Sequence, residues 1–158
     1  MKKIQHELIW AIYFTMMMIG WMGIEKIGGF HDTRIELHPF FTNLVMIPAI
    51  AIYVMAIRKK RLQLGGRLSF KQAFISGSIM TFFVTLLTPL VIYISVTWIS
   101  PDFFKNMIQF AAENKLMTNT AAIEYFNLKS YMIQSVIATP FMGLITTAIV
   151  AIFSSMKK

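Results

Sequence analysis

The chain has 158 residues, of which 56% are hydrophobic and only 14% are charged. A soluble domain carries about 25% charged residues because its surface faces water, so this composition excludes an ordinary soluble domain and predicts an integral membrane protein. The sequence contains no cysteine, which excludes disulfide bonds, thiolate metal sites and a cysteine nucleophile.

Long apolar stretches at residues 8–27, 38–57, 73–99 and 132–153 predict four transmembrane helices. At about 1.5 Å per residue, a helix of about 20 apolar residues crosses a hydrocarbon core of about 30 Å. The predicted fold class is therefore an all-α membrane protein, with a single four-helix transmembrane domain over residues 1–158. The first stretch is longer than the apolar region of a signal peptide and lacks an A-x-A-like site after it, so we expect an uncleaved span.

The basic residues are concentrated at both termini and in the central connector at residues 58–71. Lys and Arg collect in cytoplasmic segments, so both termini and the central connector are expected in the cytoplasm, and the other two connectors outside. This distribution explains the net charge of +8 without a nucleic-acid partner. It predicts a multi-pass membrane protein with both termini in the cytoplasm.

Turn and capping signals mark the ends of the spans. Gly28-Gly29 is expected to end the first span, and His38-Pro39 to begin the second, in which Pro48 should cause a kink. Arg58 to Leu68 is interpreted as the central loop. Ser69 and Gln72 fit a capping box that opens the third span.

The segment at residues 101–129, between the third and fourth spans, is predicted to be an amphipathic helical region outside the membrane. Ser100-Pro101-Asp102 has the pattern of a helix start, with a serine cap and an acid in the first turn. The helix that follows would place its apolar residues on one face, namely Phe103, Phe104, Met107, Ile108 and Ala111. A second short helix is expected at residues 121–129.

Small residues recur at every fourth position of the last two spans. The candidate packing residues are Ala73, Gly77, Thr81 and Thr85 in the third span, and Ser135, Thr139, Gly143, Thr147 and Ala151 in the fourth. Such rows let membrane helices approach closely, so the spans are expected to pack against each other, or either row to form a dimer contact. A path for a polar solute is the alternative.

No catalytic or cofactor pattern is present in the sequence. No ionisable residue lies near the middle of a span, which argues against a proton-coupled transporter. His31, Asp32, Glu36 and His38 in the first outer connector are of types that bind divalent ions, but their spacing matches no standard site. We therefore predict no catalytic residue, no cofactor and no metal site.

The basic residues of the central connector have two interpretations. They serve only to orient the chain in the membrane, or they also contact anionic lipid headgroups. The candidate lipid contacts are Arg58, Lys59, Lys60, Arg61 and Arg67.

Two short runs carry a family resemblance: Gly66 to Phe74 with Gly77 after it, and Ile99 to Phe103. They resemble a small four-span family of Bacteroidota known as domain of unknown function 4199. The resemblance covers nearly the whole chain and implies a bacterial inner-membrane protein. It transfers no catalytic or binding residue.

The function predicted from the sequence is a non-catalytic membrane subunit or scaffold, acting through helix packing and the outer amphipathic helix, without buried charges. The alternative is a small oligomeric channel or transporter, suggested by the Ser and Thr residues of the last two spans. The expected partners are the lipid bilayer and either further copies of the chain or a heteromeric membrane partner.

Overall fold

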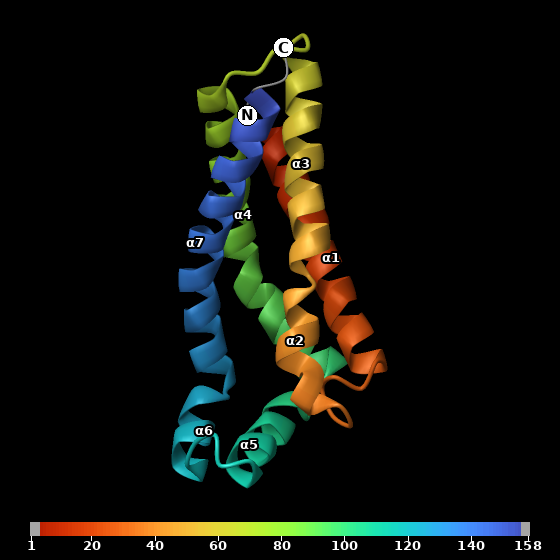
Figure 1. Cartoon of the computed structure of the whole chain (residues 1–158), viewed down its shortest axis with the longest axis vertical. Helices are drawn as coiled ribbons and strands as arrows, with labels where there is room; N and C mark the ends of the chain where they lie inside the picture. The colour runs from red at the N-terminus through yellow and green to blue at the C-terminus, as the bar shows by residue number, and fades with distance from the viewer. Residues whose placement is uncertain (1–3, 156–158) are drawn as a thin grey trace.

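The structure, a computed structural model, describes residues 4–155 and is all-helical, with no β-strand in that range (Figure 1). Four helical segments are long and apolar enough to cross a membrane, which confirms the predicted architecture. The helices are α1 (Gln5–Ile27), α2 (His38–Asn43), α3 (Met46–Gln63), α4 (Phe70–Ile94), α5 (Phe103–Glu113), α6 (Asn119–Tyr125) and α7 (Leu128–Ser155). A 3-10 turn η1 (Ile35–Leu37) precedes α2, and a π-helical segment η2 (Ser95–Ile99) extends α4.

The bundle has two distinct ends. Helix α1 begins, and α7 ends, beside the connector at residues 64–69 that joins α3 to α4; we call this the connector end (Figure 1). The opposite end carries α5, α6 and the connector at residues 28–37, and we call it the cap end (Figure 1). All of the predicted spans are longer in the structure, since the four segments run over Gln5–Ile27, Ile35–Gln63, Phe70–Ile99 and Leu128–Ser155.

The second span corrects the predicted central loop. Helix α3 continues to Gln63, so Arg58, Lys59, Lys60 and Arg61 lie on its last turns rather than in a loop. Lys and Arg are good helix formers and interact favourably with the negative end of the helix dipole, which explains the extension. The connector itself is short, and Gly65 and Gly66 both have positive φ values there, of 76° and 86°.

The kink predicted at Pro48 appears as an interruption of the second span. Helix α2 ends at Asn43 and α3 begins at Met46, with a turn at Leu44 and Val45 between them. The ring of a proline clashes with the carbonyl group four residues earlier, and for Pro48 that residue is Leu44. The break therefore lies where the proline excludes a regular helix.

The capping box at the start of α4 is confirmed. The Ser69 hydroxyl accepts a hydrogen bond from the Gln72 N–H at 3.3 Å, and the Gln72 side-chain oxygen accepts one from the Ser69 N–H at 2.9 Å. Satisfying these otherwise unpaired donors lets α4 begin at Phe70, three residues before the predicted start of the span.

The segment after the third span differs from the prediction at its boundaries. Helix α5 begins at Phe103 with Asp102 as its N-cap residue, and no side chain caps it, so the expected Ser100 cap is wrong. Its predicted apolar face is confirmed: Phe103, Met107 and Ala111 are buried, and Phe104 and Ile108 pack against them. The second helix spans Asn119–Tyr125, while residues 128 and 129 already belong to α7.

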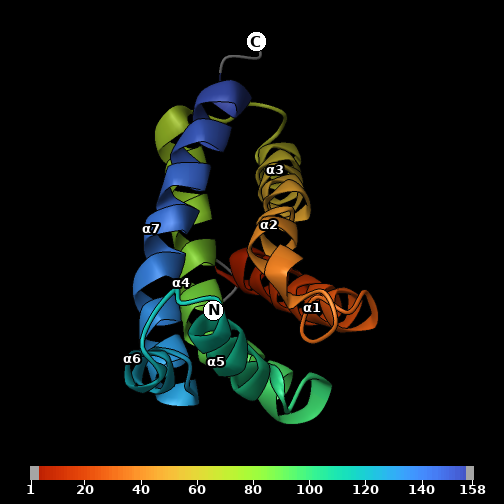
Figure 2. The same cartoon turned by 60° about the horizontal axis from the view of Figure 1, so that its bottom comes forward.

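The core is divided between the two ends of the bundle. Helices α4 and α7 lie side by side (Figures 1 and 2), whereas α1 and α2 diverge from α7 toward the cap end (Figure 1). One apolar cluster fills the connector-end half and includes Ile57, Ala73, Met80 and Ala151. A second cluster joins η1, α5, α6 and Phe126 at the cap end. The space between the clusters holds the cavities described below.

Candidate functional site

A cavity of about 300 Å³ lies between all four membrane segments. Its lining is mostly apolar, with side chains from α1, α3, α4 and α7. A few hydroxyl and amide groups interrupt this lining. The apolar residues include Phe14, Met18, Ile50, Val84 and Met142, and the polar ones are Thr15, Asn43, Tyr53, Thr88, Thr139 and Thr146. We call it the central cavity.

A second cavity, of about 310 Å³, lies at the cap end, and we call it the cap cavity. Neighbouring residues of the same helix line different cavities. On α2, Thr42 lines the cap cavity and Asn43 the central one; on α4, Ile92 lines the cap cavity and Val91 the central one. The cavities are therefore neighbours along the bundle. The cap cavity is the more polar, since His31, His38, Ser95, Ser100, Tyr131 and Gln134 contribute to its wall.

A buried hydrogen bond lies beside the central cavity, whose wall includes Tyr53. The hydroxyl groups of Tyr53 on α3 and Thr81 on α4 lie 2.8 Å apart, and Thr81 also donates to the Gly77 carbonyl at 2.9 Å. Phe14 of α1 packs edge-on against the Tyr53 ring, with centroids 5.8 Å apart. These contacts join three membrane segments just where the tightly packed half of the bundle begins.

The predicted rows of small residues lie between α4 and α7. A Cβ atom on Gly77 would lie 2.5 Å from Cγ2 of Thr147, and one on Gly143 would lie 2.5 Å from Cγ2 of Thr81. Ala73 and Ala151 are fully buried. Thr85 and Ser135 donate to carbonyls of their own helices, and Thr139 lines the central cavity. Within the chain, the buried members of the rows are thus in contact with each other.

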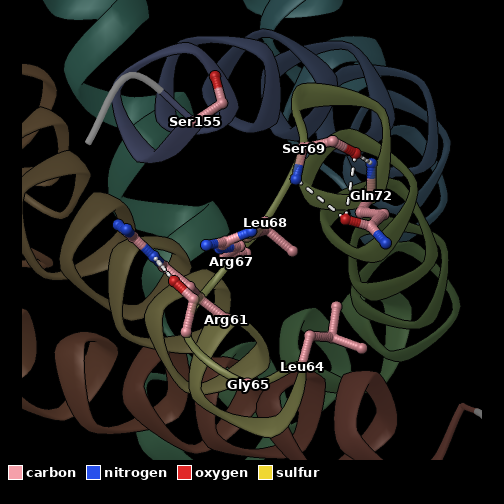
Figure 3. Close-up of a pocket in the computed structure, with 9 residues that line it drawn as sticks. Arg61, Leu64, Gly65, Arg67, Leu68, Ser69, Gln72 and Ser155 are labelled. Carbon is pink, nitrogen blue, oxygen red and sulfur yellow. Dashed lines mark hydrogen bonds between the residues drawn. The ribbon is translucent and has the colours of Figure 1, made fainter. Parts of the chain in front are cut away.

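The basic residues of the predicted lipid-contact set separate into different surroundings. Arg61 and Arg67 line a surface hollow at the connector end, where the Arg61 Nε donates to the Gly66 carbonyl at 2.6 Å (Figure 3). Arg67 is exposed and its side chain reaches into this hollow (Figure 3). Arg58 and Lys59 are exposed on α3, whereas Lys60 turns inward to an acidic residue.

That acidic residue is Glu7, which corrects the expectation of a chain without buried charges. Its side chain is 2% exposed, and its Oε1 accepts from the Lys60 Nζ at 2.8 Å and from the Ser76 hydroxyl at 2.6 Å. The group thereby links α1, α3 and α4 near the connector end. A buried charge is tolerated only when it is paired and hydrogen-bonded, as Glu7 is.

A second buried charged group lies at the cap end. Glu25, at the end of α1, is fully buried; its Oε1 accepts from the Trp21 Nε1 at 3.0 Å, and its Oε2 lies 3.2 Å from the His31 Nε2. His31 and His38 are in ring contact, with centroids 5.3 Å apart. One potential ligand atom from each of Glu25, His31 and His38 lies within 4.8 Å of the others.

The sequence-based candidates in this connector are therefore divided. His31 and His38 come together, whereas Asp32 forms a partly buried ion pair with Lys26 at 2.7 Å and Glu36 is exposed. The Lys26 ammonium group and the Thr33 N–H hold the pKa of Asp32 below its ordinary value. Glu25 was not among the residues singled out from the sequence, although the predicted first span contains it. Its spacing from Trp21, one helical turn earlier, was the available signal.

Comparison with known proteins gives one match, to the family described as "Protein of unknown function (DUF4199)", over residues 9–156. No curated protein and no solved structure matches the chain. The match covers nearly the full length, and it confirms the resemblance carried by the runs at Gly66–Phe74 and Ile99–Phe103. The chain belongs to this family of proteins of unknown function.

Proposed function

We propose that this chain is a non-catalytic, multi-pass protein of a bacterial inner membrane that binds a lipid in the cavities of its cap-end half. The observation that carries the proposal is the central cavity, an apolar space of about 300 Å³ between the membrane segments. Sites for small organic ligands are typically concave, apolar and about 300–1,000 Å³ in volume, with a few polar groups that orient the ligand. The two neighbouring cavities have this composition.

The contrast between the two halves of the bundle favours binding over passage. In the connector-end half, buried side chains such as Ile57, Met80 and Ala151 pack between the helices, and a hollow of about 430 Å³ remains between α3 and α7. A solute path would have to cross this packed half, including the hydrogen bond between Tyr53 and Thr81. We therefore treat the cavities as a binding pocket and keep the channel hypothesis as the alternative.

A lipid is the occupant that best fits this environment. The central cavity lies within the segments that cross the membrane, where lipid chains are the surrounding solvent. Its apolar walls suit an acyl chain. The donors and acceptors of the cap cavity, among them Ser95, Ser100 and Gln134, suit a polar headgroup. We therefore place the headgroup at the cap end and the chain in the central cavity.

The orientation follows from the distribution of charge. The connector end carries Arg58, Lys59, Arg61 and Arg67, and basic segments remain in the cytoplasm during insertion. Both termini and the connector end are thus cytoplasmic, and the cap end, with the amphipathic segment at residues 101–129, lies outside. The lipid enters from the outer leaflet.

The predicted role as a subunit or scaffold is compatible with lipid binding. A partner or a second copy would have to contact the outward faces of the spans, because the small-residue rows are buried between α4 and α7. Recovery of the intact chain from its membrane in a stable assembly would support this extension. Recovery only as a monomer would reject it without affecting the proposed lipid site.

Lipid binding can be tested with a fluorescent acyl-chain probe and the purified chain in nanodiscs. Ala49 lines the central cavity, so Ala49→Phe should fill it and weaken binding of the probe at least about tenfold, as expected for loss of about 1.4 kcal/mol. Ile47→Phe is the matched control, since Ile47 lies on the same helix but is 70% exposed outside the cavity. Equal binding by both variants would refute the proposed site. Solute flux through liposomes containing the wild-type chain would support the channel alternative.

A further inference from the structure

The geometry points to a divalent-metal site formed by Glu25, His31 and His38, for which Zn²⁺ is the ion of best-matched chemistry. The site is independent of the proposed lipid binding, because it rests on side chains that meet each other in the chain itself. One carboxylate and two imidazoles are a ligand set that Zn²⁺ uses when it keeps an open fourth position. The oxygen-preferring ions Ca²⁺ and Mg²⁺ do not favour two nitrogen ligands.

The ligand atoms would have to move only a short distance to bind one ion together. Zn–N and Zn–O bonds of about 2.0–2.1 Å place two ligands of a tetrahedral ion about 3.3 Å apart. Glu25 Oε2 and His31 Nε2 are separated by 3.2 Å, so they already have this spacing. The ligand atoms of the full set lie within 4.8 Å of one another, so the third ligand must approach by no more than about 1.5 Å. His38 begins α2 directly after a connector, where such an adjustment is easiest.

The second observation is that these side chains are buried while some of their nitrogen atoms have no hydrogen-bond partner. Glu25 is fully buried and His31 is 3% exposed. Among the described residues, no hydrogen-bond partner reaches the buried Nδ1 atoms of His31 and His38. An unsatisfied buried polar atom costs about 1–3 kcal/mol, so such atoms need an explanation. An ion bound through the His31 Nε2 and the His38 Nδ1 accounts for the unpaired nitrogen of His38 beside the buried carboxylate.

Neighbouring side chains hold the potential ligands in place. Trp21 donates to the Glu25 Oε1 at 3.0 Å, and Asn106 of α5 donates to the His31 carbonyl at 2.9 Å. The Phe103 ring packs against both imidazoles, with centroids 4.9 Å from His31 and 5.1 Å from His38. Orienting contacts of this kind are typical around metal ligands. Helix α5 thus covers the site.

The fourth position of the ion would face the cap cavity. His31 and His38 belong to the wall of this space of about 310 Å³, together with Ser95, Ser100 and Gln134. The volume accommodates water, whose share of liquid volume is about 30 Å³ per molecule. A bound ion could therefore carry a water molecule or an oxygen ligand there, as zinc sites with three protein ligands do.

The test is calorimetric titration of the full chain, purified with a tag that contains no histidine and stripped of metal with a chelator. We expect one equivalent of Zn²⁺ to bind with micromolar or tighter affinity, and Mg²⁺ not to compete. Co²⁺ should bind with the intense visible absorption of a tetrahedral ion. Zn²⁺ binding weaker than millimolar, or displacement of Zn²⁺ by equimolar Mg²⁺, would overturn the assignment.

Variants identify the ligands. His31→Ala, His38→Ala and Glu25→Gln should each weaken Zn²⁺ binding by more than the roughly 10–100-fold that loss of an orienting partner causes. Asn106→Ala, which removes only an orienting contact, should remain within that range. The controls are Asp32→Asn and Glu36→Gln, acidic residues of the same connector that lie outside the cluster; they should bind as the wild type does.

Folding of each variant is checked by far-ultraviolet circular dichroism and gel filtration. His38→Gln offers a second test, because His38 is only partly buried and the glutamine retains a polar side chain. If this variant folds and binds Zn²⁺ as tightly as the wild type, the assignment of His38 is refuted. If the wild type binds an ion but the Asp32 and Glu36 controls lose it, the site lies elsewhere in the connector and the proposal is also overturned.

Discussion

The hydroxyl groups of Tyr53 and Thr81 lie 2.8 Å apart, and Tyr53 also forms part of the wall of the central cavity. Gly143 of α7 lies against the same pair: a Cβ atom at that position would be 2.8 Å from the Thr81 hydroxyl and 3.0 Å from the Tyr53 hydroxyl. The contact therefore joins α3, α4 and α7 at one point. It lies between the buried apolar cluster of the connector-end half and the central cavity.

Removing one member of this pair should destabilise the bundle. Tyr53→Phe leaves the Thr81 hydroxyl bonded only to the Gly77 carbonyl, so we expect a loss of about 1 kcal/mol in the free energy of unfolding. Thr81→Val should cost more, because it leaves the buried Tyr53 hydroxyl without a partner, at about 1–3 kcal/mol. Equilibrium unfolding in mixed detergent micelles measures both values. An unfolding free energy equal to that of the wild type in both variants would show that the contact has no structural role.

The close approach of α4 and α7 predicts that added volume is not tolerated at their interface. Gly77→Ala would place its Cβ atom 2.5 Å from Thr147, and we expect overpacking to destabilise the fold by about 1–3 kcal/mol. Gly20→Ala is the matched control, because nothing lies within 4 Å of its Cβ position in α1. This control should be neutral or stabilising by up to about 1 kcal/mol. The prediction fails if both variants have the same unfolding free energy.

The Glu7–Lys60 pair, whose side chains are 2% and 21% exposed, should contribute more to stability than the Lys26–Asp32 pair, whose side chains are 35% and 36% exposed, although their N–O distances are nearly equal at 2.8 and 2.7 Å. Glu7→Gln removes a charge-assisted bond in a buried setting, and we expect a loss of about 1.5–3 kcal/mol. Asp32→Asn at the surface should cost no more than about 1 kcal/mol.

A double-mutant cycle with Lys60→Gln isolates the buried interaction, with an expected coupling of about 0.5–3 kcal/mol. Ser76 also donates to Glu7, so Ser76→Ala should reduce the same coupling. A coupling near zero would mean that Glu7 and Lys60 contribute independently. The ion pair would then not be what links α1 to α3.

The orientation of the chain predicts opposite labelling of the two ends. The sequence has no cysteine, so an introduced cysteine is the single site that a thiol reagent can label. Leu64→Cys at the connector end and Leu116→Cys at the cap end replace residues that are 44% and 64% exposed. In cells whose outer membrane has been permeabilised while the inner membrane stays sealed, a membrane-impermeant maleimide should label Leu116→Cys only. Labelling of Leu64→Cys under these conditions would reverse the proposed topology.

The hollow at the connector end predicts a contact with anionic lipid through Arg67. Each basic residue near an anionic membrane surface contributes about 1 kcal/mol, so Arg67→Gln should reduce retention of anionic phospholipid about fivefold. Lys115→Gln is the control, because Lys115 lies between α5 and α6 at the cap end. Lipid analysis of the purified variants measures how much anionic phospholipid each one retains. Equal retention of anionic phospholipid by the two variants would mean that the basic residues only orient the chain in the membrane.

Features that depend on neighbouring residues could be predicted from the sequence. The Ser69–Gln72 capping box and the apolar face of α5 follow from patterns within one or two helical turns, and both were confirmed. The four spans follow from length and composition. The family was also identified from short runs near the ends of the third span.

The candidate site was less predictable, because its members come from distant segments. Glu25 is buried because the connector at residues 28–37 folds back over α1, and because Phe103 and Asn106 of α5 cover His31. No local pattern encodes that arrangement. The charged residues after the second apolar stretch were assigned to a connector, which placed Arg58 outside the helices. In the structure, α3 extends through it.

The most direct test of the account is native mass spectrometry of the chain extracted gently from its own membrane. We predict that one lipid molecule remains bound to the wild type and to Ile47→Phe, and is lost from Ala49→Phe, in which the central cavity is filled. A wild-type chain that carries no lipid would contradict the proposed function. So would an Ala49→Phe variant that retains the same lipid in the same proportion.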